Sequence, residues 1–179
     1  MSNDFKKETH GNANKTYVVF DIETTGFSAT TDRITEIGAV KIVNRAITEG
    51  FNQLINPGIP IPPRITEITG ITSYMLKGKP SIEEALPLFL RFCAGSTIVA
   101  HNARFDMGFI KYNANKQGLD CDFVVLDTLE IARRLFPRLV NHKLDTVARH
   151  LGVELLEHHR AADDAKATAR IFLKCMEIF

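Results

Sequence analysis

The stretch "YVVFDIETTGF", Tyr17 to Phe27, begins as an apolar run typical of a buried β-strand and then places Asp21 and Glu23 among the apolar residues. Side chains two residues apart in a strand lie on the same side, so these two carboxylates are neighbours. Like charges at that range repel each other unless a positive charge lies between them. The stretch therefore predicts a cation bound at the end of a strand.

The totals of the chain favour one globular domain. It has 179 residues, of which 45% are hydrophobic and 24% charged, which suffices for one domain with a core. We expect residues 1–15 to be a disordered polar tail and residues 16–179 to form the domain. The sequence contains no apolar run of membrane-spanning length and no secretory signal. Cys93, Cys121 and Cys175 are an odd number and far apart, which indicates reduced packing thiols. These features predict a cytoplasmic protein without a membrane partner.

The net charge of +1 excludes a protein that coats duplex nucleic acid through a strong global field. An enzyme that binds only a few nucleotides at a chain end remains compatible, because bound metal ions would supply the positive charge.

The order of patterns predicts an α/β fold. Residues 16–56 contain three β-rich runs with short connections, which predicts an antiparallel meander. Ser81 and Glu84 have capping-box spacing before a helical pattern. From residue 97 onwards strands and helices alternate, with one helix ended by Gly118, which predicts parallel pairing. We expect a mixed central sheet, a three-strand meander plus parallel strands, flanked by helices.

Two further acids lie on apolar helix faces. Asp106 shares a face with Phe109 and Ile110, and Asp164 shares one with Ile171 and Cys175. Adjacent Asp163 faces the opposite way. His158 with Asp163 and His159 with Asp164 have the same spacing, but only the second pair puts its acid on the buried face. We therefore assign His159 and Asp164 to the site.

Asp21, Glu23, Asp106 and Asp164 are thus four carboxylates that can converge. Oxygen ligands suit hard cations such as Mg²⁺ or Mn²⁺, and two such ions can stabilise an in-line displacement at phosphorus. His159 has an intrinsic pKa near neutrality and can accept a proton from water. The predicted catalytic residues are these four metal ligands and His159.

The segments "FDIETTG", "AHNARFD" and "HHRAADDA" resemble the three motifs of the DEDDh (DnaQ-like) 3′→5′ exonuclease family. The resemblance covers nearly all of the chain from Tyr17 onwards. It implies a ribonuclease H-like fold, with Asp21, Glu23, Asp106 and Asp164 as ligands of two divalent metal ions and His159 as general base.

Finer segments, among them "ITEITGITSYML" and "NHKLDTVARHLGV", resemble the proofreading exonuclease domain of PolC-type DNA polymerase III and, less closely, its separate epsilon subunit. This resemblance implies hydrolysis of the last phosphodiester at a single-stranded DNA 3′ end, release of nucleoside 5′-monophosphates, and a replicative DNA polymerase as partner in cis or in trans. The 179 residues contain no polymerase module, so the domain is either a stand-alone relative or a part of a longer protein. Two alternatives stay open: an oligoribonuclease-like RNA 3′→5′ exonuclease of the same group, and a non-catalytic module that binds a polymerase or nucleic acid.

The turn after the acidic strand is a candidate substrate site. Backbone N–H groups around Gly26 and the hydroxyls of Thr24 and Thr25 would hold the terminal nucleotide, with Phe27 against a base. Phe105 could stack on a base in the same way, although core packing explains both phenylalanines equally well. By resemblance, Ile68 and Thr69 would also border the terminal base.

Three polar residues are excluded from the predicted site. Asp127 reads as a helix N-cap, with Glu130 three residues later. His101 and His142 are expected to make hydrogen bonds or lie at the surface rather than to bind metal.

Overall fold

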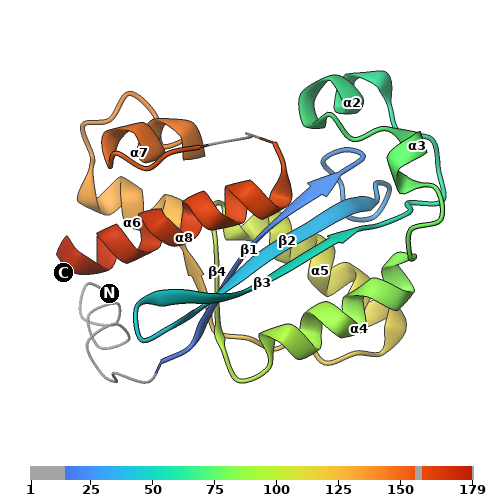
Figure 1. Cartoon of the computed structure of the whole chain (residues 1–179), viewed down its shortest axis with the longest axis horizontal. Coiled ribbons are helices and arrows are strands. Elements are labelled where there is room, and N and C mark those ends of the chain that lie inside the picture. The colour runs from blue at the N-terminus through green and yellow to red at the C-terminus, as the bar shows by residue number, and fades with distance from the viewer. Residues whose placement is uncertain (1–14, 156–158, 179) are drawn as a thin grey trace.

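A mixed five-stranded sheet forms the centre of the molecule (Figure 1). The computed structural model describes residues 15–155 and 159–178. The strands lie in the order β3-β2-β1-β4-β5, with bounds β1 Tyr17–Thr24, β2 Ile34–Val43, β3 Ala46–Leu54, β4 Thr97–Ala100 and β5 Val125–Asp127. The predicted tail over residues 1–15 lies outside the described residues except for Lys15.

The pairing directions confirm the predicted topology. β1 pairs with β2, and β2 with β3, in antiparallel directions, which is the three-strand meander. β4 pairs with β1 and with β5 in parallel directions, as expected where helices connect the strands. The parallel pairing with β4 accompanies β1 only as far as Val19. The last part of β1 therefore projects beyond β4.

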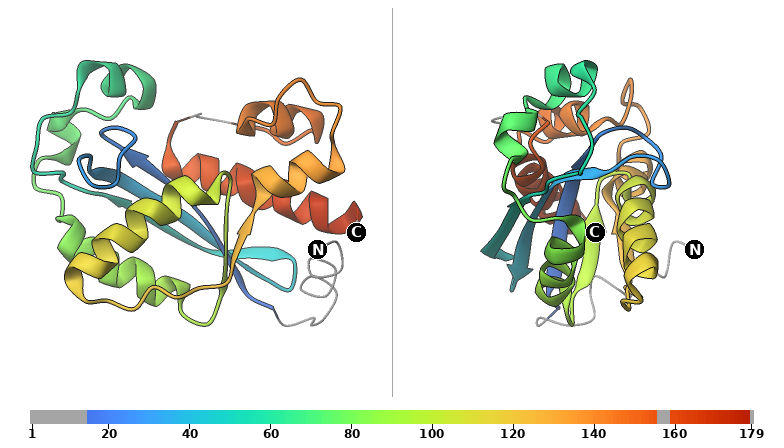
Figure 2. Two further views of the ribbon diagram at one scale, coloured as in Figure 1. Left: turned by 180° about the vertical axis from the view of Figure 1, so that it is seen from behind. Right: turned by 90° about the vertical axis from the view of Figure 1, so that its right-hand side faces the viewer.

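Helices cover both faces of the sheet (Figure 2). α4 (Ile82–Cys93) and α5 (Ala103–Gln117) lie on one face, where they pack on Val18 and Phe20 of β1. α6 (Thr128–Leu135), α7 (Leu144–His150) and α8 (Ala161–Ile178) lie on the other face with Tyr17 and Val19. This alternation along β1 continues to its end, so Asp21 and Glu23 lie on the face that α8 covers.

Two short helices, α2 (Pro63–Thr69) and α3 (Ser73–Leu76), lie beyond the end of the sheet. Ile61, Ile71 and Leu76 form their small buried cluster. Figures 1 and 2 show α2, the carboxyl end of β1 and the amino end of α8 at the same end of the molecule. Segments from three distant parts of the sequence thus meet there.

Local signals in the sequence agree with the observed helix ends. Ser81 and Glu84 form the predicted capping box of α4, and Gly118 ends α5 in the left-handed conformation. All three cysteines are free thiols, with Cys93 and Cys175 buried. Within residues 15–155 and 159–178, no helix is both long and apolar enough to cross a membrane.

Candidate active site

The carboxyl end of β1 carries the first two acids of the site. Across the antiparallel pair, Asp21 lies opposite Gly38 and Glu23 lies opposite Glu36. Residues directly opposite each other in such a pair point to the same face. Asp21 and Glu23 therefore share one side of the sheet, as predicted, and Glu36 adds a third acid to that side.

The first turn of α5 brings Asp106 to the same end of β1. Asp127 fixes this helix start: its Oδ1 accepts a hydrogen bond from the backbone N–H of Asn102 at 2.9 Å, and its Oδ2 accepts one from that of Ala103 at 3.0 Å. Asp106 is 3% exposed, and its Oδ1 accepts a hydrogen bond from the backbone N–H of Ile22 at 3.2 Å. Beyond the parallel pairing with β4, Asp106 thus binds directly to β1 between Asp21 and Glu23.

The amino end of α8 brings Asp164 and His159 to the same place. A Cβ added to Gly38 would lie 2.2 Å from the backbone carbon of Ala161, so the missing side chain allows the start of α8 to rest directly on β2. Asp164 is 4% exposed, and its Oδ2 accepts a hydrogen bond from the backbone N–H of His159 at 3.1 Å. The structure agrees with the predicted inward orientation of Asp164. His158, the alternative in the register prediction, lies outside the described residues.

Three of these residues form a possible metal site. One ligand atom each from Glu23, His159 and Asp164 lies within 4.8 Å of the others. The charges of Asp106 and Asp164 both act on Asp21, so all four predicted acids belong to one electrostatic cluster. The structure places His159 close enough to share a metal ion with Glu23 and Asp164, in addition to its predicted role as general base.

Burial and neighbouring negative charges raise the pKa values of Glu23, Asp106 and Asp21 and so oppose their ionisation. Burial, and then the charges of Asp164, Glu36 and Asp106, raises the pKa of Glu23 to about 8. Burial likewise raises the pKa of Asp106 to about 8, against the effect of its backbone hydrogen bonds. For Asp21, burial followed by the charge of Asp106 raises the pKa well above its ordinary value. Since nearby positive charge would reverse these shifts, the electrostatics favour a bound cation.

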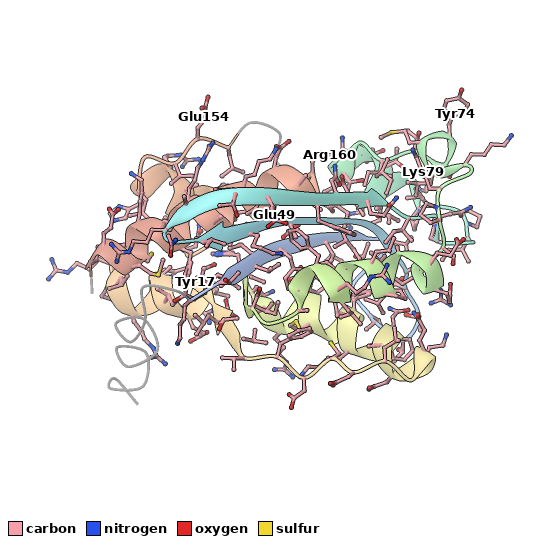
Figure 3. The ribbon with its side chains drawn as sticks, turned by 60° about the horizontal axis from the view of Figure 1, so that its bottom comes forward. Tyr17, Glu49, Tyr74, Lys79, Glu154 and Arg160 are labelled. Atoms are coloured by element: carbon pink, nitrogen blue, oxygen red, sulfur yellow. The ribbon has the colours of Figure 1, made fainter. Side chains whose placement is uncertain are left out.

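Sequence reasoning missed an ion pair beside this cluster. The side chain of Glu36 is fully buried and binds the guanidinium of Arg160. In Figure 3, Arg160 lies where α8 begins, above the sheet. Glu36 lies between Ile34 and Ile37 in the β-rich run "RITEIGAV", and an acid that is buried in such a run needs a partner. That signal could have drawn attention to Glu36, but the sequence does not identify Arg160 as its partner.

The turn after β1 is held by its own polar groups. The hydroxyl of Thr24 donates to the backbone oxygen of Gly26 at 2.6 Å, and that of Thr25 accepts from the N–H of Arg33 at 2.9 Å. The Thr25 hydroxyl keeps its own proton to donate and the Thr24 oxygen can still accept a hydrogen bond, but both side chains are buried. Phe27, by contrast, is 86% exposed, so core packing does not explain it.

The remaining predicted substrate residues differ in their surroundings. Phe105 packs on Phe109, with ring centroids 5.2 Å apart, and meets Phe27 edge to face at 6.5 Å. Ile68 is 41% exposed. Thr69 is buried, and its hydroxyl donates to the backbone oxygen of Ile65 within α2. Phe27, Phe105 and Ile68 therefore offer apolar surface, whereas Thr69 holds its own helix together.

Asp127, His101 and His142 make hydrogen bonds of the kind predicted for them. Asp127 caps α6 by accepting a hydrogen bond from Leu129 N–H at 2.9 Å. The two ring nitrogens of His101 bind the Thr128 hydroxyl and the His142 backbone oxygen, each at 2.9 Å. The ring of His142 binds the backbone oxygen of Phe136 at 3.0 Å. These side chains position loops around the acidic cluster.

Known proteins resemble the chain in sequence. The sequence model of the exonuclease family matches residues 18–172. A PolC-type DNA polymerase III of Caldanaerobacter subterraneus is 56% identical over 161 residues, which cover 90% of this chain and 12% of that protein. The corresponding polymerase of Clostridium perfringens is 53% identical over 155 residues, covering 87% and 11%. The chain thus spans about a tenth of the length of these relatives.

Solved structures resemble it in fold. Exonuclease X in complex with 5′ overhanging duplex DNA has a TM-score of 0.73 and 29% identity, covering 90% of this chain and 92% of that one. Escherichia coli exonuclease I in complex with a dT13 oligonucleotide has a TM-score of 0.78 and 20% identity, covering 89% and 40%. These likenesses confirm the predicted ribonuclease H-like fold. Together with the match over residues 18–172, they show that the chain belongs to the exonuclease family.

Proposed function

We propose that this domain is a metal-dependent 3′→5′ exonuclease that removes nucleotides from single-stranded DNA ends and releases nucleoside 5′-monophosphates. The observation that supports this most is the meeting of Asp21, Glu23, Asp106 and Asp164. The charges of Asp106 and Asp164 act on both Asp21 and Glu23 and oppose their ionisation, which a bound cation would favour. A binding module would gain nothing from such repulsion. We place the protein in the cytoplasm, with other replication enzymes.

The donor set fits two divalent cations. All four acids offer oxygen, which Mg²⁺ and Mn²⁺ prefer, and ligand atoms of Glu23 and Asp164 lie within 4.8 Å of each other, which supports a shared metal position. We assign Asp21, Glu23, Asp106 and Asp164 as ligands. When bound, the ions would lower the pKa of water and stabilise negative charge at the phosphate.

The chain's own residues would orient the reacting groups. His159, held by Asp164 through its backbone N–H, lies where its ring can accept the proton of the attacking water. Phe27 and Phe105 line a small cavity of about 310 Å³ with Arg104. Base stacking on such aromatic rings is worth about 1–3 kcal/mol per base. We propose that the terminal base lies against them, bordered by Ile68 and the turn of Thr24, Thr25 and Gly26, with Thr69 supporting Ile68 from within α2.

A larger cavity would carry the strand onward. It has a volume of about 870 Å³ and is lined by His159, Asn102, Arg133, Asn141 and Lys143, among others. Lys143 and Arg133, which is paired with Glu130, offer cationic groups that could contact the phosphates of a nucleic acid strand, beside Asp145 in the same wall. Because His159 belongs to its wall, the cavity connects with the acidic cluster and supports a route for the strand.

We further propose proofreading in DNA replication as the purpose of this activity. The similar regions of the relatives belong to proteins named DNA polymerase III PolC-type. A replicative polymerase, joined in cis or bound in trans, is the proposed partner.

The experiment that tests this function is degradation of 5′-labelled single-stranded DNA and of matched RNA, each with Mn²⁺ and with chelator. We expect stepwise shortening of DNA from its 3′ end, abolished by chelator and faster than for RNA. Faster shortening of RNA would contradict the choice of substrate, because the pocket would then favour the 2′-hydroxyl. Binding of either strand without hydrolysis would contradict the enzyme assignment.

A further inference from the structure

We propose that Arg160 and Glu36 are positioning residues that hold the backbone of His159 in its working geometry. This inference rests on the proposed exonuclease function. Neither side chain is a predicted metal ligand or proton acceptor, but together they fix the segment between the sheet and the start of α8.

Glu36 acts as a rigid anchor on β2. Its carboxylate accepts hydrogen bonds from Arg160 Nε at 3.1 Å, from Arg160 Nη2 at 3.0 Å and from the backbone N–H of Ala161 at 3.2 Å. The Glu36 side chain is fully buried, whereas that of Arg160 is 28% exposed. A two-point contact between a guanidinium and a carboxylate fixes orientation as well as distance. The two residues that follow His159 are therefore tied directly to the sheet.

The backbone of His159 needs such restraint. Its φ angle is 69°, in the left-handed region that non-glycine residues seldom adopt and that persists only where surrounding contacts impose it. Asp164 holds His159 from one side through its N–H, and the Glu36–Arg160 pair holds the next residue. Without the pair, we expect His159 to relax towards ordinary dihedral angles and its ring to move away from Glu23 and Asp164.

The anchor is separate from what holds α8 itself. Ala167, Ile171, Phe172 and Cys175 of α8 are buried in the core with β1 and β2. Apolar packing of this extent keeps the helix in place even when a polar contact at its end is lost. Removal of the pair should therefore disturb the His159 segment while leaving the fold intact.

The experiment uses the double variant E36Q/R160Q, because removal of Arg160 alone would leave Glu36 buried and unpaired and could unfold the protein. We expect it to fold and to lose about 10–100-fold in kcat on 5′-labelled single-stranded DNA with Mn²⁺. KM for DNA should stay within about two-fold, because a group that acts only in the chemical step changes kcat rather than KM. R160K alone should remain impaired, because lysine cannot make the two-point contact. The control D163N/K166Q removes the solvent-facing pair of the same helix and should keep full kcat.

A double-mutant cycle between E36Q/R160Q and H159A decides whether Glu36 and Arg160 act through His159. The single-turnover rate constant is measured with excess enzyme for all four variants. In the H159A background, E36Q/R160Q should change this rate constant by no more than about two-fold, because the positioned group is already absent. Full additivity of the two losses would overturn the proposal, as would a rise in KM alone, which would make Arg160 a substrate contact. An inactive wild type would overturn the proposed function together with this inference. An active wild type whose double variant keeps its kcat would overturn this inference alone.

Discussion

Glu23 and Glu36 lie opposite each other on adjacent strands, yet the protein treats them differently. Glu36 is completely buried and receives three hydrogen bonds, two of them from Arg160. Glu23 lies among Asp164, Glu36 and Asp106, and its pKa rises to about 8. Arg160 acts on Glu23 too, but its charge opposes this rise only in part.

The difference separates a structural acid, Glu36, from a proposed metal ligand, Glu23. A buried carboxylate with a protein cation completes a polar contact and stabilises one local arrangement. A buried carboxylate that lies mainly among other carboxylates stores repulsion, which a metal ion relieves on binding. The cross-strand pair thus marks the boundary between the scaffold and the proposed reaction centre.

The largest effect should come from Glu23→Gln. We expect turnover of single-stranded DNA to fall by about 10³-fold or more, because metal ions supply several kcal/mol of transition-state stabilisation.

Glu23→Gln should also raise the melting temperature of the metal-free protein at pH 9, where repulsion among the acids is strongest. Glu36→Gln should instead lower it, since Arg160 loses its charged partner, at a cost of about 1–3 kcal/mol. Thermal denaturation with chelator measures the melting temperatures of both variants. Shifts of the same sign would contradict the difference between Glu23 and Glu36.

The next largest effect should separate the two histidines. His159→Ala should lower turnover by about 10²–10³-fold through loss of the proton acceptor. His158→Ala should have little effect, because its partner in the rejected register, Asp163, binds Lys166 at the surface. Single-turnover assays on labelled DNA with Mn²⁺ compare the two variants. Equal losses would refute the assignment of His159.

Gly38→Ala should lower turnover, by less than the variants above. The new Cβ would lie 2.2 Å from the Ala161 backbone, so the start of α8 must shift, and misplacement by about 1 Å can cost about 10²-fold in rate. Gly50→Ala is the matched control, because the nearest atom to its Cβ is 3.9 Å away. We expect it to change stability by no more than about 0.5 kcal/mol. Activity and melting temperature of both variants test the close approach of α8 to β2.

The last effect concerns stability alone, which should depend on pH when metal is absent. The pKa of Glu23 rises from 4.5, and that of Asp106 from 3.8, to about 8, so the folded state binds more protons than the unfolded state between these values. The contribution of these two acids to stability should therefore be full below about pH 4 and should be lost as pH rises through 8. Mn²⁺ should raise the melting temperature more at pH 8 than at pH 5.5. A metal-induced shift that is equal at both pH values would argue against the acids as ligands.

Periodicity and spacing predicted most of the fold and the acids of the site. The meander, the capping box at Ser81 and the inward face of Asp164 follow from local rules, because strand and helix periods fix which side chains share a face. The convergence of Asp21 with Asp106 agrees with the motifs as well. These features depend on nearest neighbours in the sequence or on family spacing.

Contacts between distant segments could not be predicted in the same way. Glu36 and Arg160 are 124 residues apart, and nothing in either local pattern names the other. The close approach of Gly38 to Ala161 and the clamp of Asp127 on Asn102 likewise depend on how strands and helices meet. The hydroxyls of Thr24 and Thr25 bind within their own turn, a choice that the composition of the turn leaves open.

The most direct test of the central claim is the anomalous scattering of manganese in crystals grown with Mn²⁺ and a single-stranded DNA product. We predict two peaks roughly 4 Å apart, coordinated by Asp21, Glu23, Asp106 and Asp164, with Glu36 still bound to Arg160. Manganese coordinated by Glu36, or absent from Glu23 and Asp164, would contradict the division between structural acid and metal ligand.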